Sequence, residues 1–163
     1  MQLCAELGKY ERLIYNSLEE GTCLTMQNTL RNFNMQELNR RMQVVDESIE
    51  EFSERLSRHK AQQIAVIDSF QYTQMTYKSY IKFKEQHRDK LLIFISHADG
   101  SNPSGRSAKS VMYDAGLKVW VHNYRAFSKG RFIGDTGYFD IWPEKARRHW
   151  GEKETDSKKN TNL

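Results

Sequence analysis

The chain has 163 residues and lacks the features that mark secreted or membrane-spanning proteins. Its two cysteines, Cys4 and Cys23, have no CxxC spacing, so buried reduced thiols are expected and a metal or disulfide role is the alternative. No apolar run approaches the roughly 20 residues that a membrane-spanning helix needs. The first residues do not combine a basic stretch with an apolar one, as a signal peptide does. These absences favour a cytoplasmic protein without membrane attachment.

Acidic side chains are scarce in residues 78–131. The net charge is +4, with 38% hydrophobic and 28% charged residues, as in soluble globular proteins. Residues 1–77 have a net charge of −3, whereas residues 78–131 carry 11 basic and 4 acidic side chains. This basic segment can face the phosphates of a nucleotide or a nucleic acid. An ordinary solvated surface is the alternative.

Apolar patterns alternate between helix and strand over most of the chain. Helical patterns occupy residues 2–9, 22–33, 34–41, 48–59 and 76–88, and strand-like apolar runs occupy 12–18, 42–45, 64–67 and 91–95. The run 91–95 is apolar on both faces, which is typical of a parallel strand covered by helices. The sequence therefore predicts an α/β fold with a mostly parallel sheet flanked by helices.

The second half of the chain has a different pattern. Residues 98–106 predict a polar loop and 108–113 a short helix. Three alternating segments joined by glycine-containing turns then predict antiparallel strands at the C-terminal edge of the sheet: 117–121, 124–127 and 138–142. Residues 151–163 are polar, and we expect a disordered tail there.

Carboxylates follow two of the expected strands. Asp68 ends the run Ile64–Ile67, and ligands bind open α/β sheets at this end of the strands. Asp68 can hold a magnesium ion there, or it can be a helix cap or turn residue. Glu19 and Glu20 follow the run 12–18, where a carboxylate can orient and deprotonate a water molecule. An exposed acidic turn is the alternative.

Polar residues also follow two later strands. His97 lies beyond the run 91–95 and can donate a hydrogen bond to a phosphate, or it can be a structural histidine. Lys129 and Arg131 lie one residue apart near a turn. Such cations can reach a phosphate on a neighbouring subunit as an arginine finger. A solvated basic turn is the alternative.

Taken together, these segments resemble the RecA-like ATPase core, especially its RadA-like and DnaB-type helicase branches. Ser17-Leu18-Glu19-Glu20 resembles the strand with the catalytic glutamate, and Val66-Ile67-Asp68-Ser69 resembles the Walker B strand. Ile95-Ser96-His97 stands where the family has its sensor strand, in which glutamine is commoner. Lys129-Gly130-Arg131-Phe132 resembles the family's Lys-x-Arg pattern. The match covers roughly residues 1–142.

The resemblance implies a DNA-dependent ATPase of recombination, repair or replication, with residues 1–150 as a partial RecA-like core. It implies ATP and Mg²⁺ as cofactors, with Asp68 holding the ion through water. Glu19 with Glu20 would polarise water, His97 would sense the γ-phosphate, and Lys129 and Arg131 would act on the adjacent protomer of a ring or filament. The loop 98–109 would contact DNA, with single-stranded DNA favoured over double-stranded DNA, through Gly100, Asn102, Arg106 and Lys109.

The sequence departs from this family in one respect. The P-loop pattern Gly-x-x-x-x-Gly-Lys-Ser/Thr is absent, so the cradle for a triphosphate is absent too. We expect a core truncated after the Walker A region, without its first P-loop strand. The alternative function is a non-catalytic remnant that keeps DNA or subunit contacts. Phe94-Ile95-Ser96-His97 also resembles the opening strand of TIR-type signalling domains, but no glutamate occurs between His97 and Glu144.

Overall fold

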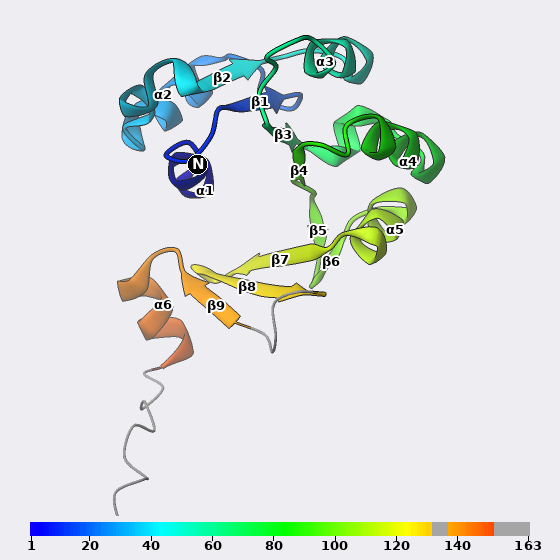
Figure 1. Cartoon of the computed structure of the whole chain (residues 1–163). Coiled ribbons are helices and arrows are strands. Elements are labelled where there is room, and N and C mark those ends of the chain that lie inside the picture. The colour runs from blue at the N-terminus through cyan, green and yellow to red at the C-terminus, as the bar shows by residue number, and fades with distance from the viewer. Residues whose placement is uncertain (132–136, 152–163) are drawn as a thin grey trace, which may run out of the picture. The chain divides into compact units, whose positions relative to one another are not determined.

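The computed structural model describes residues 1–131 and 137–151 (Figure 1). The chain divides into two compact units, Met1–Asp114 and a second that begins at Ala115. The predicted core of residues 1–150 spans the first unit and most of the second. Each unit has its own sheet, so we describe the two separately.

The first unit contains a four-stranded parallel sheet. Its strands are β1 Leu13–Ser17, β2 Met42–Val45, β3 Ile64–Asp68 and β4 Leu91–Phe94, in the order β2-β1-β3-β4. The register pairs Ser17 with Asp68 and Ile67 with Phe94. The carboxyl ends of β1, β3 and β4 therefore meet at one edge. The predicted α/β class and parallel sheet are confirmed.

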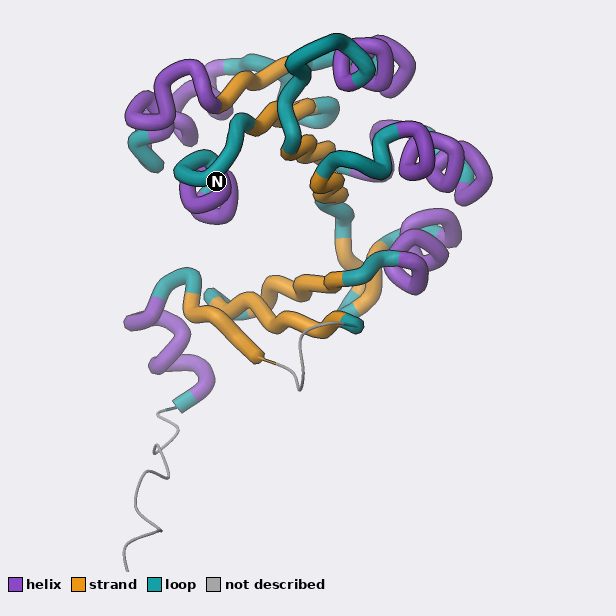
Figure 2. Tube along the Cα trace, viewed as in Figure 1, coloured by secondary structure: helices purple, strands orange, loops and turns teal. Residues whose placement is uncertain are grey.

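Helices cover both faces of this sheet (Figure 2). Successive side chains of a strand point to opposite faces, so Leu13 and Tyr15 join one buried cluster and Ile14 joins the other. The first cluster includes residues of α1 Gln2–Leu7, α2 Leu24–Asn32 and the 3₁₀ segment η1 Met35–Arg41. The second includes residues of α3 Ile49–Leu56, the 3₁₀ turn η2 Phe70–Thr73, α4 Tyr77–Gln86 and α5 Arg106–Asp114.

Helix α3 shows how the sequence sets an element boundary. The Ser48 hydroxyl accepts a hydrogen bond from the Glu51 backbone N–H, at 3.3 Å. The Glu51 carboxylate accepts one from the Ser48 backbone N–H, at 3.0 Å. This capping box satisfies two N–H groups that have no partner inside the helix. The helix predicted within residues 48–59 is confirmed, with Ser48 as its N-cap residue.

The second unit holds β7 Leu117–His122, β8 Arg125–Gly130, β9 Gly137–Asp140 and α6 Pro143–Trp150. We expected its antiparallel strands at the edge of the parallel sheet. They pair instead with one another, in the order β7-β8-β9, in a sheet of their own. The expected placement is wrong because alternating apolar residues indicate a strand but not its partner.

Two further elements differ from the sequence expectation. The predicted loop 98–106 contains a short hairpin of β5 Ala98–Asp99 and β6 Asn102–Pro103. Helix α6 was not predicted, although Pro143 in its first turn and three basic residues in its last turn are favourable helix signals. The predicted tail 151–163 lies, apart from Gly151, outside the described residues. Within residues 1–131 and 137–151, no helix has the length and apolar character needed to cross a membrane.

Candidate functional site

The carboxyl edge of the parallel sheet brings three predicted site residues together. The backbone N–H groups of Leu18 and Glu19 both donate to the Asp68 carbonyl oxygen, at 2.7 and 3.3 Å. These bonds fix the turn after β1 against the end of β3. The next strand of the sheet, β4, ends three residues before His97. Glu19, Asp68 and His97 therefore surround one point of this edge.

His97 and Glu19 form a direct side-chain contact. Nε2 of His97 lies 2.8 Å from Oε2 of Glu19 and 3.3 Å from Oγ of Ser69. An ionised carboxylate only accepts hydrogen bonds, so Nε2 carries the proton when Glu19 is charged. The two side chains are 46% and 38% exposed, so water and a ligand can reach the pair.

A buried tyrosine orients the side chain of Asp68. The Tyr15 hydroxyl donates to Oδ2 of Asp68. Burial, and then the hydrogen bond to Asp68, hold the pKa of Tyr15 well above its usual range, so the hydroxyl stays a donor. The side chain of Asp68 is half-buried, and the Asp68–Ser69 peptide bond is cis. The carboxylate is therefore held in one orientation at the end of β3.

Gln71 connects the ends of β3 and β4. Its Nε2 donates to Oγ of Ser96 and to the carbonyl oxygen of Ser104, both at 2.8 Å. Its Oε1 accepts from the His97 backbone N–H at 3.1 Å. This amide fixes the start of the loop that carries His97. No sequence pattern pointed to Gln71, whereas Ser69 is adjacent to a predicted site residue.

The same edge continues over β1 and β2. The buried Asn16 side chain donates to the Glu47 carbonyl oxygen and accepts from the Glu47 N–H, both at 2.9 Å. Gly21 has φ +59°, and an added Cβ would lie 2.9 Å from Oδ2 of Asp46, so the turn after β1 approaches Asp46 closely. Glu20 is exposed in this turn and forms no hydrogen bond or ion pair with the residues that the structure describes. No contact therefore supports the predicted role of Glu20 beside Glu19.

The predicted DNA-contact residues lie on the hairpin β5–β6 and the start of α5. Gly100, with φ +62°, and Asn102 belong to the hairpin. Arg106 and Lys109 project from the first turns of α5. All four are exposed. A groove of about 220 Å³ lies between η2 and the start of α5.

Lys129 and Arg131 lie in the second unit. Lys129 is exposed on β8, directly opposite Lys118 on β7. Like charges in directly opposed positions repel each other, and Lys118 turns to donate to the Ala115 carbonyl oxygen at 2.8 Å. Arg131 follows β8, and its backbone N–H donates to the Gly116 carbonyl oxygen at 3.0 Å. The two cations are thus at the end of one strand of this unit.

The carboxylates at the carboxyl edge fit a magnesium ion only if a bound phosphate supplies further ligands. Among residues 1–131 and 137–151, no group of three or more His, Cys, Asp or Glu side chains is placed to hold a metal. Mg²⁺ keeps several waters and usually takes one or two carboxylates together with substrate phosphates. Asp68 supplies one oriented carboxylate of this kind, so its geometry fits a metal–phosphate complex.

The comparisons with known proteins add no assignment. No protein-family model matches the chain. A search of curated proteins found no significant match.

Proposed function

We propose that this chain carries the metal- and water-handling part of an ATP-hydrolysing site, as in RecA-like DNA-dependent ATPases. The observation that supports this best is the Glu19–His97 contact at 2.8 Å, at the same sheet edge as Asp68, whose carboxylate is oriented by Tyr15. An acid–base pair next to a carboxylate at the carboxyl ends of parallel strands suits the hydrolysis of a bound phosphate ester.

Each residue has a distinct proposed role. Glu19 accepts a proton from the attacking water, and before a ligand binds, its bond to His97 holds the carboxylate at this edge. His97 can turn its Nε2–H to a terminal phosphate when that ligand displaces Glu19. Asp68 holds Mg²⁺ through water, and the bound ion would offset negative charge on the phosphates. Tyr15, by donating to Asp68, directs the other carboxylate oxygen outward.

The remaining parts of the proposal rest on the family resemblance. Lys129 and Arg131 would act on a phosphate of the adjacent protomer in a ring or filament. The hairpin β5–β6 and α5 would contact single-stranded DNA through the exposed residues Arg106 and Lys109. Such an enzyme would work in the cytoplasm on recombination, repair or replication.

A second candidate is a non-catalytic module that keeps DNA or subunit contacts. The observation behind it is that the sequence contains no P-loop pattern. The segments that follow the four parallel strands also contain no Lys or Arg: residues 18–23, 46–48, 68–76 and 95–97. A triphosphate, in contrast, needs N–H groups and cations around it.

Isothermal titration of the purified chain with ATP and Mg²⁺ separates the two candidates. We expect micromolar binding for the first candidate, and at least tenfold weaker binding by Asp68→Asn, which keeps an acceptor for Tyr15. Glu19→Gln is expected to bind ATP normally and to lose about 10²- to 10⁴-fold in hydrolysis rate. Glu11→Gln, an exposed glutamate before β1, serves as the control. No binding by a folded chain supports the second candidate, and equal hydrolysis in Glu19→Gln and the control contradicts the assignment of Glu19.

A further inference from the structure

The parallel sheet of the first unit has two edges of opposite charge. Parallel strands place all their amino ends at one edge and all their carboxyl ends at the other. The segments at the carboxyl ends, residues 18–23, 46–48, 68–76 and 95–97, contain five carboxylates and no Lys or Arg. The segments that lead into the strands, residues 8–12, 38–41, 57–63 and 87–90, contain eight basic and two acidic side chains. The proposed hydrolytic site occupies only the acidic edge.

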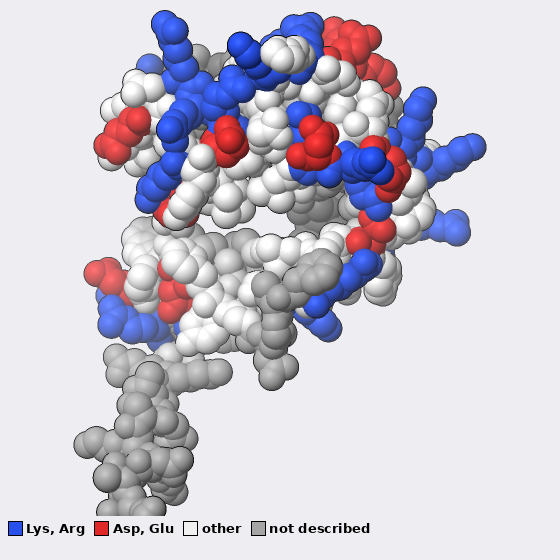
Figure 3. Space-filling model, in the orientation of Figure 1, with Lys and Arg blue, Asp and Glu red and all other residues white. Residues whose placement is uncertain are grey.

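Each of the four strands is preceded by cations. Of the eight, Lys90 has a side chain that is only 6% exposed, and Lys9 is paired with Glu6 at 2.5 Å. The remaining six are exposed, and we call them the amino-edge patch: Arg12, Arg40, Arg41, Arg58, Lys60 and Arg88. Figure 3 shows Lys and Arg side chains running across this unit, with fewer acidic ones among them.

Backbone carbonyls orient two members of the patch without neutralising them. Nη2 of Arg12 donates to the Lys60 carbonyl oxygen at 2.7 Å. Nη1 of Arg41 donates to the carbonyl oxygens of Lys9 and Gly8, at 2.7 and 3.3 Å. Within the described parts of the chain, no carboxylate forms an ion pair with any of the six cations. Their charges are therefore available to an anion from outside.

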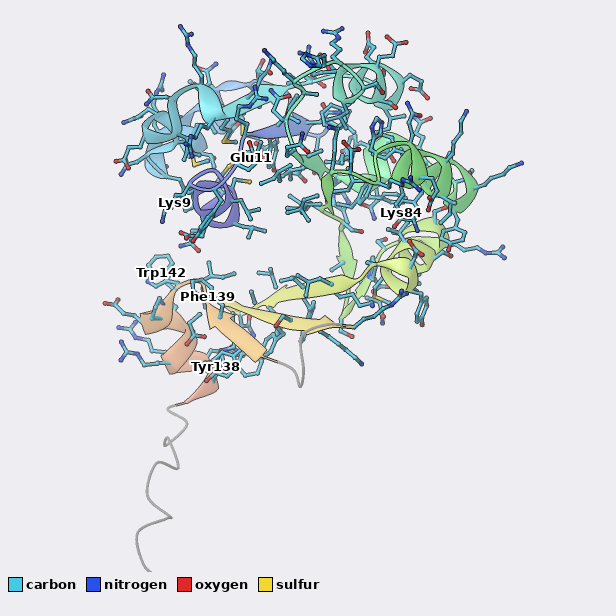
Figure 4. The ribbon with its side chains drawn as sticks, viewed as in Figure 1. Lys9, Glu11, Lys84, Tyr138, Phe139 and Trp142 are labelled. Carbon is cyan, nitrogen blue, oxygen red and sulfur yellow. The ribbon has the colours of Figure 1, made fainter. Side chains whose placement is uncertain are left out.

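An exposed aromatic ring stands within the patch. Tyr10 is 76% exposed, and the carbonyl of its neighbour Lys9 accepts the bond from Arg41. Figure 4 places Lys9 and Glu11, the residues on either side of Tyr10, beside α1 and the start of β1. The Tyr10 backbone N–H donates to the Leu7 carbonyl oxygen at 3.0 Å, which fixes the turn that carries the ring. An uncovered ring on a fixed turn among cations can stack on a nucleobase.

We propose that the amino-edge patch binds single-stranded nucleic acid, with the phosphates on the Arg and Lys side chains and a base on Tyr10. Neighbouring strands lie about 4.8 Å apart, so the patch spans about 14 Å from β2 to β4. A single strand that is stacked as in duplex DNA, at about 3.4 Å per nucleotide, would place about four nucleotides along this length, close to the smallest sites of single-strand binding folds. The ring favours nucleic acid over an acidic protein, because cations alone would serve either partner. The proposal is independent of ATP hydrolysis, since this surface is at the opposite edge from Glu19.

Fluorescence anisotropy of labelled oligothymidylate, with the full chain and no nucleotide added, tests the charges. Arg40→Glu/Arg58→Glu changes two exposed cations whose side chains form no hydrogen bond or ion pair within residues 1–131 and 137–151, and Lys78→Glu/Lys82→Glu on α4 is the charge-matched control. We expect the first variant to lose at least tenfold in affinity. The slope of log K against log salt concentration should become shallower by about 1.4, because two phosphate contacts are lost at about 0.7 each. Equal losses in the two variants, or no binding by the unchanged chain, would overturn the proposal.

Two further measurements test the stacking and the competing surfaces. Tyr10→Ala should weaken binding by about tenfold and Tyr10→Phe by little, because both rings stack. If Arg106→Glu/Lys109→Glu abolishes binding while the patch variant leaves it intact, the site is the α5 surface and this proposal is wrong. If polyglutamate competes equally and Tyr10→Ala has no effect, the patch binds anionic polymers in general, and the assignment to nucleic acid fails. Circular dichroism of every variant confirms that the fold is retained.

Discussion

Replacement of Asn16 by alanine is expected to destabilise the first unit strongly. The side chain is 0% exposed, and its amide satisfies both the N–H and the carbonyl of Glu47. Each buried group left without a partner costs about 1–3 kcal/mol. Glu47 is only half-buried, so water can replace part of the loss, and we expect a decrease of about 2–4 kcal/mol in the free energy of unfolding. Total stabilities of about 5–15 kcal/mol are usual, so the effect is large.

Urea unfolding followed by circular dichroism measures this change. Asn28→Ala is the matched control, because Asn28 is exposed and bonds only to Arg31, at 3.1 Å. Its effect should stay within about 0.5 kcal/mol. Asn16→Leu keeps a similar branched shape without the hydrogen bonds, so it should be nearly as unstable as Asn16→Ala. A loss below about 1 kcal/mol for Asn16→Ala with an unchanged m value, or full recovery in Asn16→Leu, would refute the hydrogen-bond account.

Two other predictions concern stability. Burial lowers the pKa of His87 in the folded state below its ordinary 6.5. Between the two pKa values the unfolded state therefore binds more protons than the folded state. The free energy of unfolding should fall as pH drops below about 6.5, until the folded pKa is passed. His87→Gln should flatten this part of the pH profile in urea titrations, and an unchanged profile would contradict it. In the second unit, the buried Arg125 bonds Asp140 at 2.5 and 3.3 Å. Arg125→Ala should destabilise this unit, measured by tryptophan fluorescence during unfolding, because it leaves Asp140 without its partner. Unfolding unchanged from that of the original chain would show that the pair is not important.

One physical reason underlies both the predicted parallel sheet and the proximity of the polar residues that follow its strands. Apolar runs such as Ile64–Ile67 are too short for helices and apolar on both faces, so they fit strands covered by helices. In a parallel sheet, the residues that follow such runs share one edge. The proximity of Glu19, Asp68 and His97 follows from this geometry, whereas their chemical roles stay predictions.

The sequence did not predict the contacts that orient these residues. Tyr15 reaches Asp68 from a neighbouring strand, and Gln71 reaches His97 from a 3₁₀ turn. Both contacts depend on register and side-chain direction, which no local pattern contains. The placement of β7, β8 and β9 at the edge of the parallel sheet was wrong for a related reason, because alternation specifies the faces of a strand but not its neighbour.

The charge polarity of the sheet shows how one topology can separate two kinds of ligand. A metal–phosphate complex at the carboxyl edge needs carboxylates, and those carboxylates would repel a nucleic-acid backbone that lay beside them. Placing the cations at the amino edge puts them a full strand length away, about 17 Å for five residues at about 3.4 Å each. That distance exceeds the Debye length of about 8 Å at physiological salt, so the two proposed sites would bind their ligands independently. Variants of the amino-edge patch should therefore leave nucleotide binding unchanged, and Asp68→Asn should leave oligonucleotide binding unchanged.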